Sequence, residues 1–128
     1  PKYGDVVEDC IRGLKRVVDR AVKFGVKKDR IIIDPGIGFA KTPTQNLEIL
    51  RRLSEFKVLG FPILVGTSRK STIGAVLGLP VDQRLEGTAA TVAICITKGA
   101  DIVRVHDVAE MSRVVKMSDA IVRGWSDK

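Results

Sequence analysis

One stretch of twelve residues, Ile31 to Thr42, constrains the fold of this chain more than any other; its sequence is IIIDPGIGFAKT. A run of β-branched residues is typical of a strand buried on both faces, as strands are in a parallel sheet. The loop that follows holds Gly36 and Gly38, and glycine permits sharp turns and a close approach to a ligand. Asp34 is therefore predicted at the carboxyl end of a buried strand, where α/β folds bind ligands. The alternative is that Asp34 only caps the following turn.

The rest of the chain alternates helical and extended patterns. Helical patterns cover about residues 5–24, 43–56, 73–77, 82–98 and 107–121, and two more short apolar runs, 62–66 and 101–106, predict strands. One helix followed by three strand–helix units predicts a parallel sheet with right-handed crossovers. A closed barrel of such units typically needs about 250 residues, whereas this chain has 128. We therefore expect half of a larger α/β structure.

Two local patterns make sharper predictions. Thr42 is expected as an N-cap, with Pro43 at the first helical position and Gln45 closing a capping box. The helix predicted over 82–98 carries small residues between Gly87 and Ala93, so another element is expected to pack closely against it.

Composition excludes several classes of function. The net charge is +7, and nine of the 22 Lys and Arg lie in the first 30 residues. These cations are scattered around one helix with almost no aromatic residues, which favours small anionic substrates over nucleic acid.

Neither a membrane span nor a signal peptide is predicted. Cys10 and Cys95 form no CxxC pair, which favours reduced thiols in the cytoplasm, and His106 is the only histidine, so no histidine-based metal site is expected.

The three predicted strands end in polar residues. Asp34 ends the first, GTSRKS (residues 66–71) follows the second, and Arg104 with His106 ends the third. Alternate residues of a strand share a face, so Ile102, Arg104 and His106 are expected to point together. One acid, three cations (Arg69, Lys70 and Arg104), hydroxyl groups and an imidazole at one edge suit an anion or a polar heterocycle. The alternative is a purely structural ion pair between Asp34 and Lys70 or Arg104.

Standard nucleotide and hydrolase motifs are incomplete. Lys41 stands where GxGxxG requires its third glycine, and Arg69 stands where a P-loop requires glycine. No spacing places a serine against His106, so a Ser–His–Asp arrangement is not predicted.

Three stretches in register, DPGIGFAKT, GTSRKS and RVHDV, resemble dihydropteroate synthase, a pterin-binding TIM-barrel enzyme of folate biosynthesis and the target of sulfonamides. The resemblance covers essentially the whole chain. It implies an α/β fold that is a partial (β/α)8 barrel, with the last three parallel strands and four helices. Residues 1–128 would form the C-terminal half of the pterin-binding domain.

The resemblance also implies a role for seven substrate-binding residues: Asp34, Phe39, Gly66, Lys70, Ser71, Arg104 and His106. Asp34 would accept N–H bonds from the pterin, and Arg104 would stack its planar guanidinium on the pterin ring. Lys70 would contact the pterin and lie near p-aminobenzoate, while Phe39 and Ser71 would contact the ring and carboxylate of p-aminobenzoate. Arg104 and His106 would bind the diphosphate, and Lys70, Arg104 and His106 are the implied catalytic residues.

The implied reaction joins p-aminobenzoate to 6-hydroxymethyl-7,8-dihydropterin diphosphate, giving 7,8-dihydropteroate and diphosphate, with Mg2+ in a cytoplasmic homodimer. The family's metal ligand and first five strands have no counterpart in these 128 residues, so the chain alone is expected to be inactive. One alternative is a pterin-dependent methyltransferase of the same superfamily, against which GTSRKS and RVHDV argue. Another is a non-catalytic fragment that binds pterin or anions or serves assembly.

Overall fold

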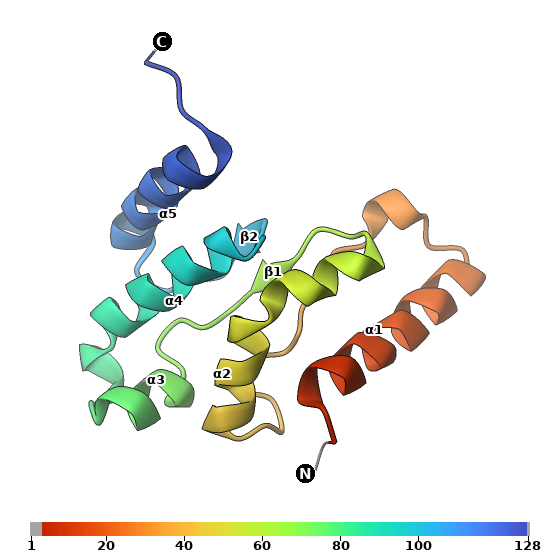
Figure 1. The fold of residues 1–128 in the computed structure, drawn as a ribbon, viewed down its shortest axis with the longest axis horizontal. Helices are drawn as coiled ribbons and strands as arrows, with labels where there is room; N and C mark the ends of the chain where they lie inside the picture. The colour runs from red at the N-terminus through yellow and green to blue at the C-terminus, as the bar shows by residue number, and fades with distance from the viewer. Residues whose placement is uncertain (1–3, 128) are drawn as a thin grey trace.

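Helices dominate the computed structural model, which describes residues 4–127. The α-helices are α1 (Val6–Lys23), α2 (Pro43–Arg51), α3 (Ser71–Leu77), α4 (Leu85–Thr97) and α5 (Val108–Arg123). The strands are β1 (Leu64–Val65) and β2 (Ile102–Val103), and three 3-10 helices are η1 (Lys28–Arg30), η2 (Leu53–Leu59) and η3 (Val81–Gln83). The short strands lie in the middle of the molecule, with α1 and α5 at opposite ends (Figure 1).

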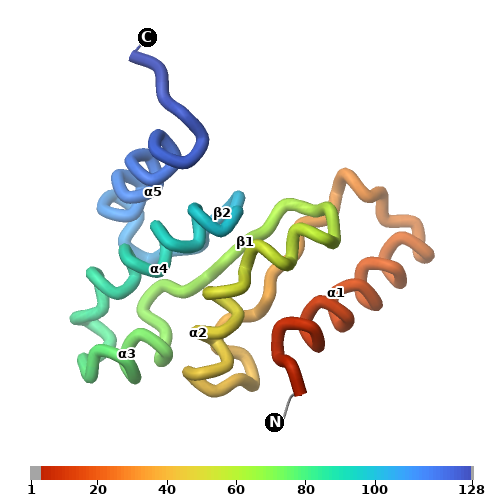
Figure 2. The backbone as a smooth tube through the Cα atoms, viewed as in Figure 1, coloured from red at the N-terminus to blue at the C-terminus, as the bar shows by residue number. Residues whose placement is uncertain are grey.

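The extended segments are parallel, as the sequence predicts. β1 pairs with β2 in the register Leu64 to Ile102. The segment 31–34 runs beside 62–66 in the same direction (Figure 2) but pairs through a single bridge, Ile33 to Ile63. The expected first strand is thus reduced to one bridge, and three full strands are not observed. Within residues 4–127 no segment pairs with the other edge of 31–34.

The start of α2 agrees with the sequence prediction, because Thr42 and Gln45 form a capping box with bonds of 3.1 and 2.9 Å. At the start of α1, the Asp5 carboxylate accepts hydrogen bonds from two amides of the first turn. The predicted helix over 43–56 was too long, because α-helical geometry ends at Arg51 and continues as the 3-10 helix η2. The guanidinium of Arg52 at this junction bonds to Asp5 and Glu55.

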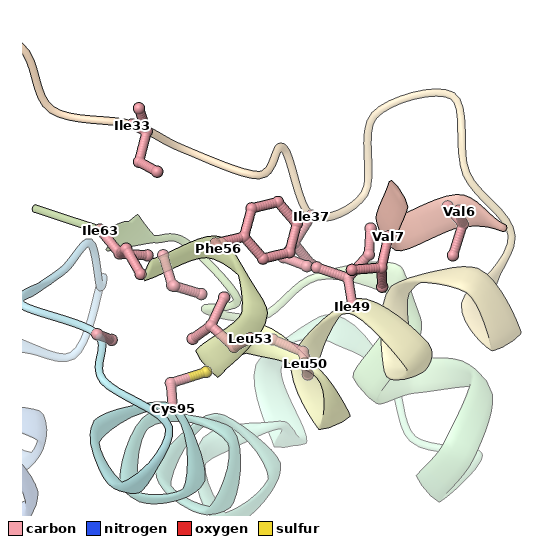
Figure 3. Close-up of a cluster of buried hydrophobic side chains, with 12 residues drawn as sticks. Val6, Val7, Ile33, Ile37, Ile49, Leu50, Leu53, Phe56, Ile63 and Cys95 are labelled. Atoms are coloured by element: carbon pink, nitrogen blue, oxygen red, sulfur yellow. The ribbon is translucent and has the colours of Figure 1, made fainter. Parts of the chain in front are cut away.

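The main hydrophobic core lies on one side of the strands, between them and the helices. Figure 3 shows side chains of α2 and η2 meeting the strand segments and Cys95 of α4. A second cluster joins α4 and α5 over Val103 and Val105 of the third strand segment. On the opposite side of the strands, Ile32 is 53% exposed and Ile102 is 38% exposed. The helix-facing side is therefore packed, while the face that would line a barrel is open.

The small residues of α4 are explained partly by α3. A Cβ added at Gly87 would lie 2.3 Å from Cγ2 of Ile73 and 3.0 Å from Cδ1 of Leu77. The close packing predicted from the small residues is thus confirmed at Gly87, and it occurs within the chain. Ala90 is exposed. The predicted helix over 82–98 starts at Leu85, because Val81–Gln83 form the 3-10 helix η3.

Candidate functional site

The polar strand ends gather at one edge of the fold, because parallel strands bring their carboxyl ends together. We call the residues after the three segments, 34–42, 66–71 and 104–107, the strand-end site. Asp34 is exposed there, and its Oδ1 accepts a hydrogen bond of 2.8 Å from the Gly36 amide. The turn-capping interpretation of Asp34 is therefore correct for one oxygen. The second oxygen has no hydrogen-bond partner within residues 4–127, so it is available to a ligand.

Lys70 is a partly buried cation of the strand-end site. Its Nζ donates to the carbonyl of Ile37 at 2.6 Å and lies 5.0 Å from the centroid of the Phe39 ring. Gly38 allows this approach, since a Cβ there would lie 3.3 Å from Cδ of Lys70. Burial lowers the pKa of Lys70, and the nearby positive charges of Arg104 and Lys41 act in the same direction, against Asp34.

The alternative of a structural ion pair is not supported. In the part of the chain that the structure describes, no carboxylate–cation contact within 4.0 Å joins Asp34 to Lys70 or Arg104. The side-chain alternation predicted for the third strand is confirmed, because Val103 and Val105 pack under the helices while Arg104 is exposed. The acid and these two cations therefore remain available to a ligand.

Arg69 does not join the other cations, contrary to the sequence prediction of three at this edge. Its guanidinium donates to both oxygens of Asp107, at 2.6 and 3.2 Å. This hydrogen-bonded ion pair lowers the pKa of the Asp107 carboxyl. The backbone of Arg69 is left-handed (φ 56°), with its amide bonded to Thr88 and its carbonyl to Arg84. Arg69 is thus a structural link between two loops of the strand-end site.

A serine does lie against the histidine, contrary to the expectation from the sequence. Ser68 Oγ is 2.8 Å from Nδ1 of His106 and also accepts the backbone amide of His106 at 3.0 Å. No carboxylate of residues 4–127 hydrogen-bonds to the imidazole, and Asp107 is engaged by Arg69. The pair therefore lacks the acid of a hydrolytic triad, and Ser68 holds His106 in place.

Four of the seven predicted site residues line one small hollow of about 80 Å³: Gly66, Lys70, Arg104 and His106, together with Ser68 and Val105. Phe39 contacts Lys70 of this group, whereas Asp34 and Ser71 are exposed and do not line the hollow. Pockets for small organic ligands usually measure about 300–1,000 Å³. A complete pocket would therefore need further walls over this hollow.

Sequence reasoning missed the polar residues that hold the site loops from below. Asn46 in α2 and Thr72 in α3 are buried and hydrogen-bonded to each other, and Asn46 also accepts the amide of Gly38. No motif marked either residue. The one signal available in the sequence was that Asn46, a polar residue, occupies a position of its helix that is otherwise expected to face the core.

Strand–helix units with functional groups at the carboxyl ends of the strands are the layout of α/β-barrel enzymes. The chain matches the family model described as pterin binding enzyme over residues 1–106. The match covers most of the chain, which therefore belongs to the pterin binding enzyme family.

Several relatives carry one particular name. Dihydropteroate synthase of Clostridium beijerinckii is 55% identical over 123 residues, which are 95% of this chain and 46% of that protein. The Bacillus subtilis dihydropteroate synthase is 51% identical over 120 residues, covering 94% of this chain and 42% of that protein. Within the family, the chain thus corresponds to a segment of dihydropteroate synthase, as the sequence motifs indicated. It spans about half the length of these relatives.

Solved structures agree with this assignment. Dihydropteroate synthase from Clostridium difficile, determined in the presence of pteroic acid, superimposes with a TM-score of 0.93 at 51% identity, over 95% of this chain and 47% of that one. The Yersinia pestis enzyme in a sulfonamide complex gives 0.94 at 37% identity, over 98% and 46%. None of the helices in residues 4–127 is long and apolar enough to cross a membrane.

Proposed function

We propose that this chain supplies the C-terminal half of a dihydropteroate synthase barrel. The reaction joins p-aminobenzoate to 6-hydroxymethyl-7,8-dihydropterin diphosphate and releases diphosphate. The observation that carries this proposal is the gathering of Asp34, Lys70 and Arg104 at one strand edge without ion pairs among them. Asp34 and Arg104 are exposed and Lys70 is only partly buried, so the charges of all three side chains can be reached by a ligand. The names of the relatives and the pteroic acid structure point to the same ligand.

The pterin would be recognised by the first and third strand ends. A carboxylate accepts two parallel N–H bonds, one at each oxygen, and each oxygen can accept more than one bond. Asp34 therefore suits the amino and ring N–H groups of a pterin even while its Oδ1 accepts from Gly36. The exposed guanidinium of Arg104 is planar and can stack on the ring, which a lysine cannot imitate. A Cβ at Gly66 would lie in ordinary contact with Lys70 at 3.7 Å and with Arg104 at 3.8 Å, so the glycine leaves a small space beside these two cations.

The second substrate would lie on the side of α3. Phe39 is 69% exposed beside Lys70, so its ring offers an apolar surface to p-aminobenzoate. The hydroxyl of Ser71, the first residue of α3, would donate to the p-aminobenzoate carboxylate. These two residues define what we call the aminobenzoate slot.

Catalysis would come mainly from stabilising the leaving group. The amine nitrogen forms a bond to the methylene carbon of the pterin substrate, the carbon–oxygen bond to diphosphate breaks, and the amine loses a proton. Lys70, Arg104 and the imidazole of His106, held by Ser68, would face the charge that develops on the diphosphate. The amine itself is the nucleophile, so no covalent enzyme intermediate is required.

Mg2+ would have to be held by ligands elsewhere in the complete barrel. Residues 4–127 contain no group of three or more His, Cys, Asp or Glu arranged to bind a metal ion. When bound, Mg2+ would neutralise negative charge on the diphosphate.

The proposal includes a cytoplasmic homodimer without a nucleic-acid partner. Cys10 and Cys95 are both free thiols, which fits a reducing compartment. The last helices carry exposed apolar side chains suited to a dimer contact, among them Met117 and Ile121 of α5.

A graft tests the proposed function. Residues 1–128 would replace the matching segment of the Clostridium beijerinckii dihydropteroate synthase, which restores a complete barrel. We expect the graft to form dihydropteroate and diphosphate, and Arg104→Ala in the same graft to abolish product formation. A folded graft that makes no product would refute the assignment.

A further inference from the structure

Two buried polar side chains connect loops that carry different parts of the strand-end site. Asn46 is 1% exposed and Thr72 is 4% exposed. Nδ2 of Asn46 donates to Oγ1 of Thr72 at 2.9 Å, and Oδ1 of Asn46 accepts the amide of Gly38 at 3.0 Å. Buried polar groups of this kind are costly unless their bonds are made, so the geometry of all three partners is closely fixed.

The partners of Asn46 are the immediate neighbours of the aminobenzoate slot. Gly38 precedes Phe39, and Thr72 follows Ser71. The side chain of Asn46 therefore bridges the loop with the aromatic wall and the helix start with the hydroxyl, although these lie far apart in sequence.

The loop that Asn46 holds would not keep its shape alone. Gly38 has φ 91°, and Ala40 is left-handed with φ 52°, an uncommon conformation for a residue with a side chain. Such backbone geometry persists when surrounding contacts determine it. The contacts here are Asn46 below the loop and Lys70, which donates to the carbonyl of Ile37 from the side of the site.

We propose that Asn46 and Thr72 are positioning residues that set the separation of Phe39 and Ser71, and with it the fit of the aminobenzoate slot. This inference rests on the proposed function. Both side chains are buried under the loops and act through the residues beside them. The pterin side of the site, with Asp34 and Arg104, is held by other bonds.

Thr72→Val tests the inference by keeping the shape of the side chain and removing the hydroxyl. In the graft, we expect the KM for p-aminobenzoate to rise about tenfold, the change that corresponds to roughly 1.4 kcal/mol. The KM for the pterin diphosphate should stay within about twofold of the parent value. Thr72→Ser keeps the hydroxyl and should restore the parent KM for p-aminobenzoate.

Ile49→Ala is the matched control for a general loss of stability. Ile49 lies in α2 one turn after Asn46, is fully buried and makes no side-chain hydrogen bond to the loop. This change should lower the melting temperature at least as much as Thr72→Val. The ratio of the two KM values should stay at the parent value, because the bridge between the loops is intact.

Amide hydrogen exchange gives a readout that does not need activity. In the chain and in the graft, the Gly38 amide should exchange faster in Thr72→Val than in the parent, relative to amides in the middle of α2. An inactive parent graft would refute the proposed function, while this exchange measurement would still decide whether Asn46 and Thr72 hold the loop. The inference is overturned if Gly38 exchange in Thr72→Val matches the parent. It is also overturned if Thr72→Val and Ile49→Ala shift both KM values alike.

Discussion

Gly87→Ala is expected to destabilise the chain, although alanine is the better helix former. Gly87 lies in the first turn of α4, where a Cβ would sit 2.3 Å from Cγ2 of Ile73 and 3.0 Å from Cδ1 of Leu77. Carbon atoms pack at about 3.5–4.0 Å, so a shift of about 1 Å is needed. Ile73 is β-branched, lies in a helix and is 5% exposed, so few alternative side-chain conformations are open to it.

The two opposing contributions can be compared. Overpacking a core costs about 1–3 kcal/mol. Replacing glycine by alanine inside a helix contributes about 1 kcal/mol of stability. Because the contact is short and Ile73 is confined, we expect overpacking near the upper end of its range. The net loss in the free energy of unfolding should be roughly 1–2 kcal/mol.

Urea denaturation followed by circular dichroism, at one fixed protein concentration, measures this difference. Gly13→Ala is the control, because Gly13 lies within α1 and a Cβ there would meet nothing within 4 Å. That variant should gain stability, by about 1 kcal/mol. Adding Ile73→Ala to Gly87→Ala removes the colliding methyl group, so the double variant should lose less than the sum of the single losses. If Gly87→Ala stabilises the chain as much as Gly13→Ala does, the packing argument is wrong.

Three further predictions concern the site and two titrating groups. In the graft, Asp34→Asn should weaken pterin binding about ten- to a hundredfold, because one N–H of the ligand loses its acceptor, while the melting temperature stays near the parent value. Titration calorimetry and a thermal melt measure these two effects. Unchanged affinity with a lower melting temperature would contradict the prediction. Asp107→Asn should make the chain less sensitive to acid. The pKa of Asp107 is lowered by Arg69, so its stabilising contribution is present above the unfolded pKa near 4 and lost as the pH falls through the folded value. An unchanged acid limb of the stability curve would contradict this. Burial raises the pKa of Cys95 to about 12, so the unfolded chain ionises first and stability falls as the pH rises above about 9. Cys95→Val should flatten that alkaline loss, and identical alkaline curves for the two proteins would exclude the effect.

Local sequence patterns predicted the features that depend on neighbouring residues. The capping box of Thr42 and Gln45 and the alternation of Val103, Arg104 and Val105 appear in the structure as expected. Parallel topology alone brings the strand ends to one edge, so the position of the candidate site followed from the order of strands and helices.

Tertiary contacts decided the features that the sequence could not predict. The segment 31–34 has the composition of a central strand, yet it forms a single bridge to Ile63 and has no partner on its other edge in residues 4–127. Arg69 was expected to face a ligand, but Asp107, 38 positions away, bonds its guanidinium. The bond between Asn46 and Thr72 likewise depends on how α2 meets α3. None of these pairings has a fixed spacing that sequence reasoning could use.

The bonds between successive loops affect how such sequences can change over time. Loop 34–42 is held by Lys70 of the next unit, and the loop 66–71 is joined to the third unit through Ser68 with His106 and Arg69 with Asp107. A change at Arg69 alone leaves the carboxylate of Asp107 without its partner. Tolerated variation should therefore occur at both positions together. Recombination between related genes should succeed most often when its breakpoints lie outside the span from 34 to 107, so that these partners are inherited as a set.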